Sequence, residues 1–190
     1  MKKKDRLYNI FFPIWVLIFF PTAWLVALPV NFIVDSAVVL IMLALFGRER
    51  ERRAAVDCET AADTPTLWKQ WIKCIFPVWG FGFLSDLIGG GFMLCWGYLP
   101  GILAGSTPFG NWWNDRIADP ISENPFTSFP ALLFAILAVA VSGACIYFLN
   151  NRFSFGRTDL SYAERRRLAL TLAIATAPYF MLIPSTLLWR

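Results

Sequence analysis

The sequence contains no histidine. That absence excludes the Ser-His-Asp and Cys-His catalytic systems and the histidine-containing zinc sites of metalloproteases. There is no glycine-rich phosphate motif, and the four cysteines form no C-x-x-C pair. Neither a disulfide, a metal nor a cofactor is therefore predicted. We expect a protein that is not an enzyme of the kinds found among soluble proteins.

Charged residues are also scarce in four long apolar stretches, which are 10–47, 75–105, 129–149 and 168–189. The chain is 57% hydrophobic and 17% aromatic, with a mean hydropathy of +0.55. A soluble domain is only roughly 45–50% apolar, even with glycine counted. The sequence therefore predicts an all-α, polytopic integral membrane protein with a single transmembrane domain over 1–190.

The first apolar stretch is too long for one crossing. A helix over 10–47 would be about 57 Å long, against a hydrocarbon core of ~30 Å. We therefore predict two spans, 10–28 and 32–47, with a break at Pro29 and Asn31. The second span is short, and a re-entrant hairpin that does not fully cross is the alternative.

Three further spans bring the predicted total to about five helices: 77–99, 130–149 and 168–189. An amphipathic helix over 65–76, starting at Thr64 and Pro65, is expected to lie at the cytoplasmic interface. The segment 105–129 is predicted to be an outer loop. A capping box at Ser161 and Glu164 starts the last helix, which Pro178 and Pro184 should kink.

The basic residues predict the orientation. Fifteen of the 17 Lys and Arg lie before the first span, between the second and third, or between the fourth and fifth. The positive-inside rule then places the N-terminus in the cytoplasm and, after five crossings, the C-terminus outside. We expect a prokaryotic plasma membrane, contact of the basic loops with anionic lipid headgroups, and no nucleic-acid partner.

Asp86 interrupts the apolar segment "GFGFLSDLIGGG" at 80–91. An aspartate near mid-bilayer costs about 2.5–3.5 kcal/mol to insert, so a compensating environment is required. Gly82, Asp86 and Gly90 are spaced at i, i+4 and i+8, and Ser85 and Gly89 lie beside them. We predict a nearly side-chain-free face that packs closely on another helix or lines a cavity.

Counting residues along the spans places Ser142, Thr176 and Tyr179 at a depth similar to that of Asp86. We predict a polar layer made of these four residues. Because no Lys or Arg lies within a span, Asp86 should be protonated unless water or a cation reaches it.

Asp35 is the second acid within a span and is expected to reach interfacial water. An intramembrane aspartyl protease would need Asp35 and Asp86 to face each other. The depth count keeps their carboxyl groups apart, and Asp86 does not directly follow a G-x-G motif as in those enzymes. This enzymatic hypothesis therefore has little support.

Two functions remain. The first is a non-enzymatic accessory, assembly or structural membrane component. The alternative is a proton- or cation-coupled small transporter or channel subunit that uses Asp86. The partner could be a second copy of the chain or another membrane protein. The sequence does not indicate a substrate.

Overall fold

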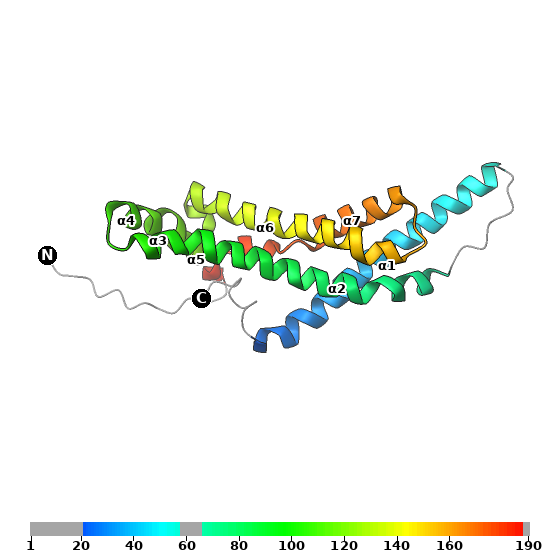
Figure 1. Cartoon of the computed structure of the whole chain (residues 1–190), viewed down its shortest axis with the longest axis horizontal. Helices are drawn as coiled ribbons and strands as arrows, with labels where there is room; N and C mark the ends of the chain where they lie inside the picture. Colours follow the sequence, from blue (N-terminus) through cyan, green and yellow to red (C-terminus); the bar gives the residue numbers. More distant parts are fainter. Residues whose placement is uncertain (1–20, 58–65, 188–190) are drawn as a thin grey trace. The chain divides into compact units, whose positions relative to one another are not determined.

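A computed structural model describes residues 21–57 and 66–187, and all the regular structure within them is helical. The α-helices are α1 (Pro21–Asp57), α2 (Leu67–Phe92), α3 (Leu99–Ala104), α4 (Pro108–Trp113), α5 (Asp119–Glu123), α6 (Phe129–Leu149) and α7 (Tyr162–Thr176) (Figure 1). Short π-helices cover Met93–Tyr98, Asn114–Ala118 and Asn150–Ser154. Single 3₁₀ turns cover Pro125–Thr127, Phe155–Arg157, Tyr179–Leu182 and Ser185–Leu187. The all-α prediction is confirmed.

The chain divides into two compact units. Within the described residues, unit 1 comprises 90–139 and 179–187, and unit 2 comprises 21–89 and 140–178. Unit 2 therefore contains α1, α7, most of α2 and the second half of α6. Each unit is described by itself below.

Three helices in the described part of the chain are long and apolar enough to cross a membrane: Trp24–Val56, Leu67–Ala104 and Phe129–Arg157. Large apolar side chains on α1 are exposed, among them Leu25 at 79%, Val26 at 69% and Ile33 at 66%. Such a surface suits contact with lipid. The described residues thus contain three candidate crossings of a multi-span membrane protein, where the sequence predicted about five spans over the whole chain.

The predicted break at Pro29 is wrong. Helix α1 continues through Pro29 without interruption, so 32–47 is neither a separate span nor a re-entrant hairpin (Figure 1). A proline is tolerated within a transmembrane helix where neighbouring groups satisfy the disturbed backbone. Pro29 removes the backbone donor of the Leu25 carbonyl oxygen. Close by, the Trp79 indole donates to the Leu28 carbonyl oxygen at 2.8 Å and so joins α2 to this turn of α1. Residues 10–20 of the predicted first span lie outside the described residues.

The predicted interfacial helix over 65–76 is not a separate element. Helix α2 begins at Leu67 and runs through Pro77 to Phe92, and helical structure continues to Ala104. Two of the apolar residues that suggested this helix, Trp71 and Ile75, contribute to the core of unit 2, at 9% and 0% exposure. The other four, Leu67, Trp68, Ile72 and Phe76, are exposed. Thr64 and Pro65 lie outside the described residues.

The predictions for α6 and for the start of α7 are confirmed, but the predicted fifth span is wrong. Helix α6 covers Phe129–Leu149, and the capping box at Ser161 and Glu164 is present. Helix α7 ends at Thr176 and is followed only by 3₁₀ turns. Pro178 explains the end, because a residue before proline is pushed out of the α region, and Ala177 has ψ 148°.

The segment 105–129, predicted as a loop, is mostly helical. It contains α4, α5 and the π-helix Asn114–Ala118. Thr107 caps α4 by accepting a hydrogen bond from the Gly110 amide at 3.1 Å. Polar turn residues in this segment therefore begin and end short helices instead of forming a long irregular connection.

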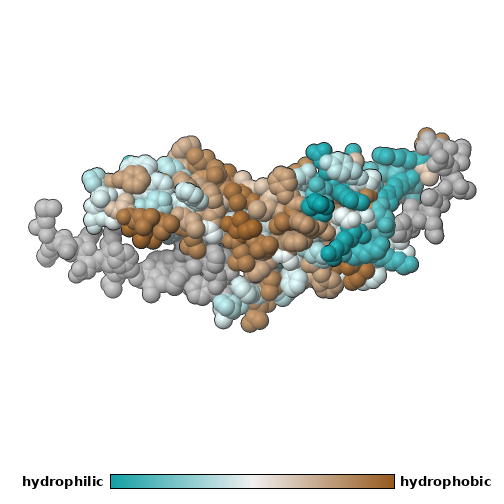
Figure 2. Space-filling model, viewed as in Figure 1, coloured by the Kyte–Doolittle hydropathy of each residue, from teal (hydrophilic) through white to brown (hydrophobic). Residues whose placement is uncertain are grey.

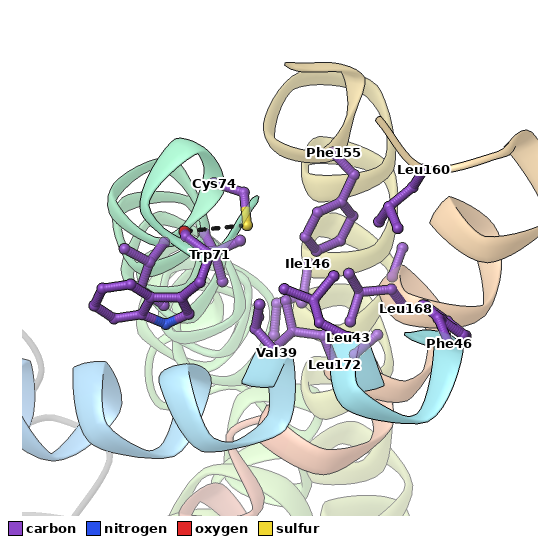
Figure 3. Packing of buried hydrophobic residues seen from close by; sticks show 14 residues of the cluster. Val39, Leu43, Phe46, Trp71, Cys74, Ile146, Phe155, Leu160, Leu168 and Leu172 are labelled. Atoms are coloured by element: carbon purple, nitrogen blue, oxygen red, sulfur yellow. Dashed lines mark hydrogen bonds between the residues drawn. The ribbon is translucent and has the colours of Figure 1, made fainter. Parts of the chain in front are cut away.

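One apolar cluster lies at the centre of unit 2. It joins residues from α1, α2, α6 and α7, and Figure 3 shows their side chains converging. The cluster is Val39, Leu43, Phe46, Trp71, Cys74, Ile75, Val78, Ile146, Phe155, Leu160, Leu168, Ala169, Leu172 and Ala173. Their burial holds α1 and α7 against α2 and so determines which polar residues of these helices meet.

Basic side chains gather at one end of unit 2, where α1 ends and α7 begins; Figure 2 shows this end as teal. Arg50 makes a bidentate pair with Glu164, at 2.9 and 2.6 Å. Arg167 lies 3.7 Å from Glu49 on α1. Two of the three basic segments that the sequence placed on one side of the membrane, 48–73 and 152–167, therefore belong to unit 2, and the third lies outside the described residues. We call this region the basic end.

Candidate functional site

Two buried aspartates from different helices of unit 2 form the centre of the candidate site. Asp35 on α1 is 3% exposed and Asp86 on α2 is 5% exposed. Asp35 lies against Gly82, one helical turn before Asp86, so the two acids belong to one polar cluster. The continuous course of α1 through Pro29 places Asn31 and Asp35 one turn apart on one face of this helix.

Polar side chains from two other helices contact Asp86. The Ser142 hydroxyl on α6 donates to Asp86 Oδ1 at 3.2 Å, and Ser142 is 0% exposed. The Asn31 amide on α1 donates to Asp86 Oδ2 at 3.5 Å. Both carboxylate oxygens of Asp86 therefore face neutral donors.

Asp35 is accommodated by the absence of a side chain at Gly82. A Cβ atom added at Gly82 would lie 3.2 Å from Asp35 Oδ2. Gly82 is one helical turn before Asp86, so the glycine face of α2 brings the two acids together. On its other side, Asp35 hydrogen-bonds with the Thr176 side chain on α7. The same Thr176 hydroxyl bonds to the Leu172 carbonyl oxygen at 2.8 Å.

No family model matches the sequence, and no curated protein or solved structure is significantly similar to it. The function must therefore be argued from the site alone.

Basic side chains are remote from this pair along the helices. Arg48 is the first basic residue of α1 after Asp35, and the 13 intervening steps correspond to about 20 Å. In the residues that the structure describes, no three His, Cys, Asp or Glu side chains form a group suited to a metal ion. We call Asn31, Asp35, Asp86, Ser142 and Thr176 the acid-pair site.

The structure distributes the residues of the predicted polar layer over two groups. Ser142 contacts Asp86, whereas Thr176 contacts Asp35. Tyr179 belongs to unit 1, and its side chain is 49% exposed.

The four residues of the predicted close-packing face also differ in what they do. Gly82 lies against Asp35. Ser85 is 0% exposed, and its hydroxyl donates to the Phe81 carbonyl oxygen at 2.6 Å. Gly89 and Gly90 are buried. A close approach therefore ties Gly82 to the acids.

Sequence reasoning placed Asp35 at interfacial water and away from Asp86. In the structure, Asp35 is buried and lies beside the glycine face of α2. The difference follows from α1, because the depth count assumed a new span after Pro29. Asn31 was read as a turn residue, yet its i, i+4 spacing to Asp35 was a signal that the two share a helical face.

Proposed function

We propose that this membrane protein is a small proton-coupled transport component in which the acid-pair site carries an exchangeable proton. The observation that supports it is the burial of Asp35 and Asp86 together among neutral hydrogen-bonding groups. Two carboxylates in a water-poor site cannot both remain charged without a cation nearby. One proton held by the pair removes one of the two charges, and it can be lost to water or replaced by a monovalent cation.

The hydrogen bonds of Thr176 depend on whether Asp35 carries a proton. A hydroxyl has a single hydrogen and two lone pairs. When Thr176 donates to the Leu172 carbonyl oxygen, it can still accept from Asp35, which must then carry the proton. Asp86, which faces donors from Ser142 and Asn31, is suited to the ionised form. The two acids of the pair thus have complementary surroundings.

The proposed setting is a prokaryotic plasma membrane with the basic end in the cytoplasm. The positive-inside rule supports this side, because Arg48–Arg53, Lys69, Lys73 and Arg165–Arg167 all belong to the ends of helices that meet there. The original assignment of a cytoplasmic N-terminus and an outer C-terminus relied on five crossings and remains a proposal from the sequence.

A second candidate is a structural or assembly component without transport activity. The hydrogen bonds from Ser142 and Asn31 favour it, because they join α1, α2 and α6 through Asp86 and would act as an interhelical clasp. In that case the proton on the pair would be permanent. Proteolysis by the pair is the least supported function, since the sequence around Asp86 lacks the aspartyl protease motif.

Infrared spectroscopy of the purified protein distinguishes these functions. We expect a carboxylic-acid band that disappears in the double variant Asp35→Asn, Asp86→Asn and that titrates between acidic and alkaline pH. Asp115→Asn, an exposed acid of unit 1, is the matched control and should leave the band unchanged. A band that ignores pH and added Na⁺ or K⁺ would identify a clasp and end the transport proposal. A titrating band leads to proton-flux assays in vesicles.

A further inference from the structure

A pocket of about 290 Å³ lies at the basic end of unit 2. The last turns of α1, the start of α2 and Leu160 line it. Its volume is near the lower limit of small-molecule sites, which are about 300–1,000 Å³. Part of the wall is apolar, formed by side chains such as Leu43 and Leu160, and part is polar.

Gln70 is the most unusual residue of the lining. The residue is 5% exposed, and among the residues that the structure describes its Oε1 atom has no hydrogen-bond partner. A buried amide oxygen without a donor is unfavourable and rare in folded proteins. The pocket therefore offers an unsatisfied acceptor to an N–H or O–H group of a ligand.

Charged residues on α1 define the rest of the polar wall. Arg50 lines the pocket but is engaged by Glu164. Arg48 and Glu51 line it as well, and neither has an ion pair among the described residues. Because they are three residues apart on one helix, their side chains are neighbours. The wall thus offers one guanidinium for an anion and one carboxylate for a cation, close to each other.

We propose that this pocket binds the phosphoethanolamine headgroup of an aminophospholipid. Arg48 would bind the phosphate, and the ammonium group would donate to Gln70 Oε1 and to Glu51. The short two-carbon link between phosphate and ammonium suits charges one helical turn apart. The apolar wall at Leu43 and Leu160 suits the glycerol and the first methylenes. This inference is independent of the acid-pair site.

Native mass spectrometry of the delipidated protein in detergent, titrated with defined lipids, tests the proposal. Phosphatidylcholine has the same charges as phosphatidylethanolamine but no N–H donors. We expect phosphatidylethanolamine to bind about tenfold more tightly, as one to two charge-assisted hydrogen bonds would give. Equal binding of the two lipids would overturn the proposal. Equal binding of phosphatidylglycerol would overturn the role of the ammonium group.

Three variants locate the binding in this pocket. Gln70→Leu should abolish the preference for phosphatidylethanolamine over phosphatidylcholine, and Arg48→Gln should weaken both lipids alike. Arg53→Gln removes a nearby exposed charge that does not line the pocket and should change neither. If Gln70→Leu folds poorly, Glu51→Gln, at an exposed position, replaces it and should lower the preference. A preference that survives both changes contradicts the proposed geometry.

Free phosphoethanolamine distinguishes a lipid from a soluble phosphate ester. We expect it to compete at least tenfold more weakly than the lipid, because it lacks the glycerol and acyl contacts with the apolar wall. Competition at equal concentration would assign the pocket to a soluble ligand and overturn the lipid assignment.

Discussion

Both units bond buried hydroxyl and indole groups to backbone carbonyl oxygens, but only unit 2 buries carboxyl groups among the described residues. In unit 1, uncharged donors bond to backbone carbonyl oxygens: Ser185 to Ser122 at 2.7 Å, Trp113 to Gly97 at 2.8 Å and Ser128 to Arg116 at 2.5 Å. The acids of unit 1 whose exposure the structure describes, Asp115, Asp119 and Glu123, are exposed. In unit 2, by contrast, Asp35 and Asp86 are buried and bond to side chains.

This difference distinguishes polar groups that only stabilise the fold from polar groups that can gain or lose a proton. A hydroxyl or indole bonded to a carbonyl oxygen has the same state at every ordinary pH. A buried carboxyl pair loses a proton as the pH rises, and its hydrogen bonds then change. Among the described residues the buried carboxyl groups lie in unit 2, so we expect proton-linked behaviour there.

The largest expected effect is a loss of folding stability from a substitution in unit 1. The backbone of Gly110, in α4, packs directly against the backbone at Gly105, so an added Cβ atom would collide with the Gly105 carbonyl oxygen. Gly105 itself has φ +56°, so this backbone has little room to shift. Gly110→Ala should lower the free energy of unfolding by about 3 kcal/mol. Thermal unfolding in detergent measures this loss.

Gly91→Ala is the matched control for that variant. It lies in the helical part of unit 1, and nothing lies within 4 Å of an added Cβ atom. Alanine should therefore be neutral or slightly stabilising there. If Gly110→Ala unfolds at the same temperature as Gly91→Ala, close backbone packing does not hold unit 1.

A smaller effect concerns the pH dependence of unit 2 at its basic end. Burial alone would raise the pKa of Glu164, but hydrogen bonds from Arg50 and from Ser161 hold the pKa below its ordinary value. The stability contributed by ionised Glu164 is therefore present above the ordinary glutamate pKa and lost as pH falls through the lowered one. Glu164→Gln keeps the capping box and removes the ion pair. It should cost about 1–2 kcal/mol at neutral pH and almost nothing in acid.

Ser185→Ala supplies the comparison from unit 1. The Ser185 hydroxyl bonds to the carbonyl oxygens of Ser122 and Glu123 at 2.7 and 3.1 Å. Its removal should cost about 1 kcal/mol at neutral and at acidic pH alike, since neither partner titrates. A cost of Glu164→Gln that is equally independent of pH would contradict the assignment of pH-linked stability to unit 2.

The sequence predicted features that depend on neighbouring residues and missed those that depend on distant ones. The capping box at Ser161 and the extent of α6 follow from local patterns and are confirmed. The continuity of α1 through Pro29 was missed, because a proline that ends a helix in water is tolerated within a membrane span. The burial of Trp71 depends on α1 and could not be told from contact with lipid.

The candidate site was predictable in part for the same reason. Asp86 stands out in any reading, because an acid in an apolar span demands compensation. Ser142 was reached by counting depth from the end of α6, a helix whose bounds are regular. Asp35 and Asn31 could not be placed without the true course of α1. The wrong interpretation of Pro29 as a helix break is therefore why the α1 residues of the acid-pair site were misplaced.

The smallest expected effect tests the close approach that joins the two acids. At Gly80 an added Cβ atom meets nothing within 4 Å, whereas at Gly82 it lies 3.2 Å from Asp35 Oδ2. Gly80→Ala should stabilise by up to about 1 kcal/mol, the helix propensity difference. Gly82→Ala should forfeit that gain and shift the carboxylic-acid band, because Asp35 must move by a few tenths of an ångström. If both variants stabilise equally and leave the band unchanged, Asp35 does not depend on the glycine face of α2, and Asp86 would have to be considered alone.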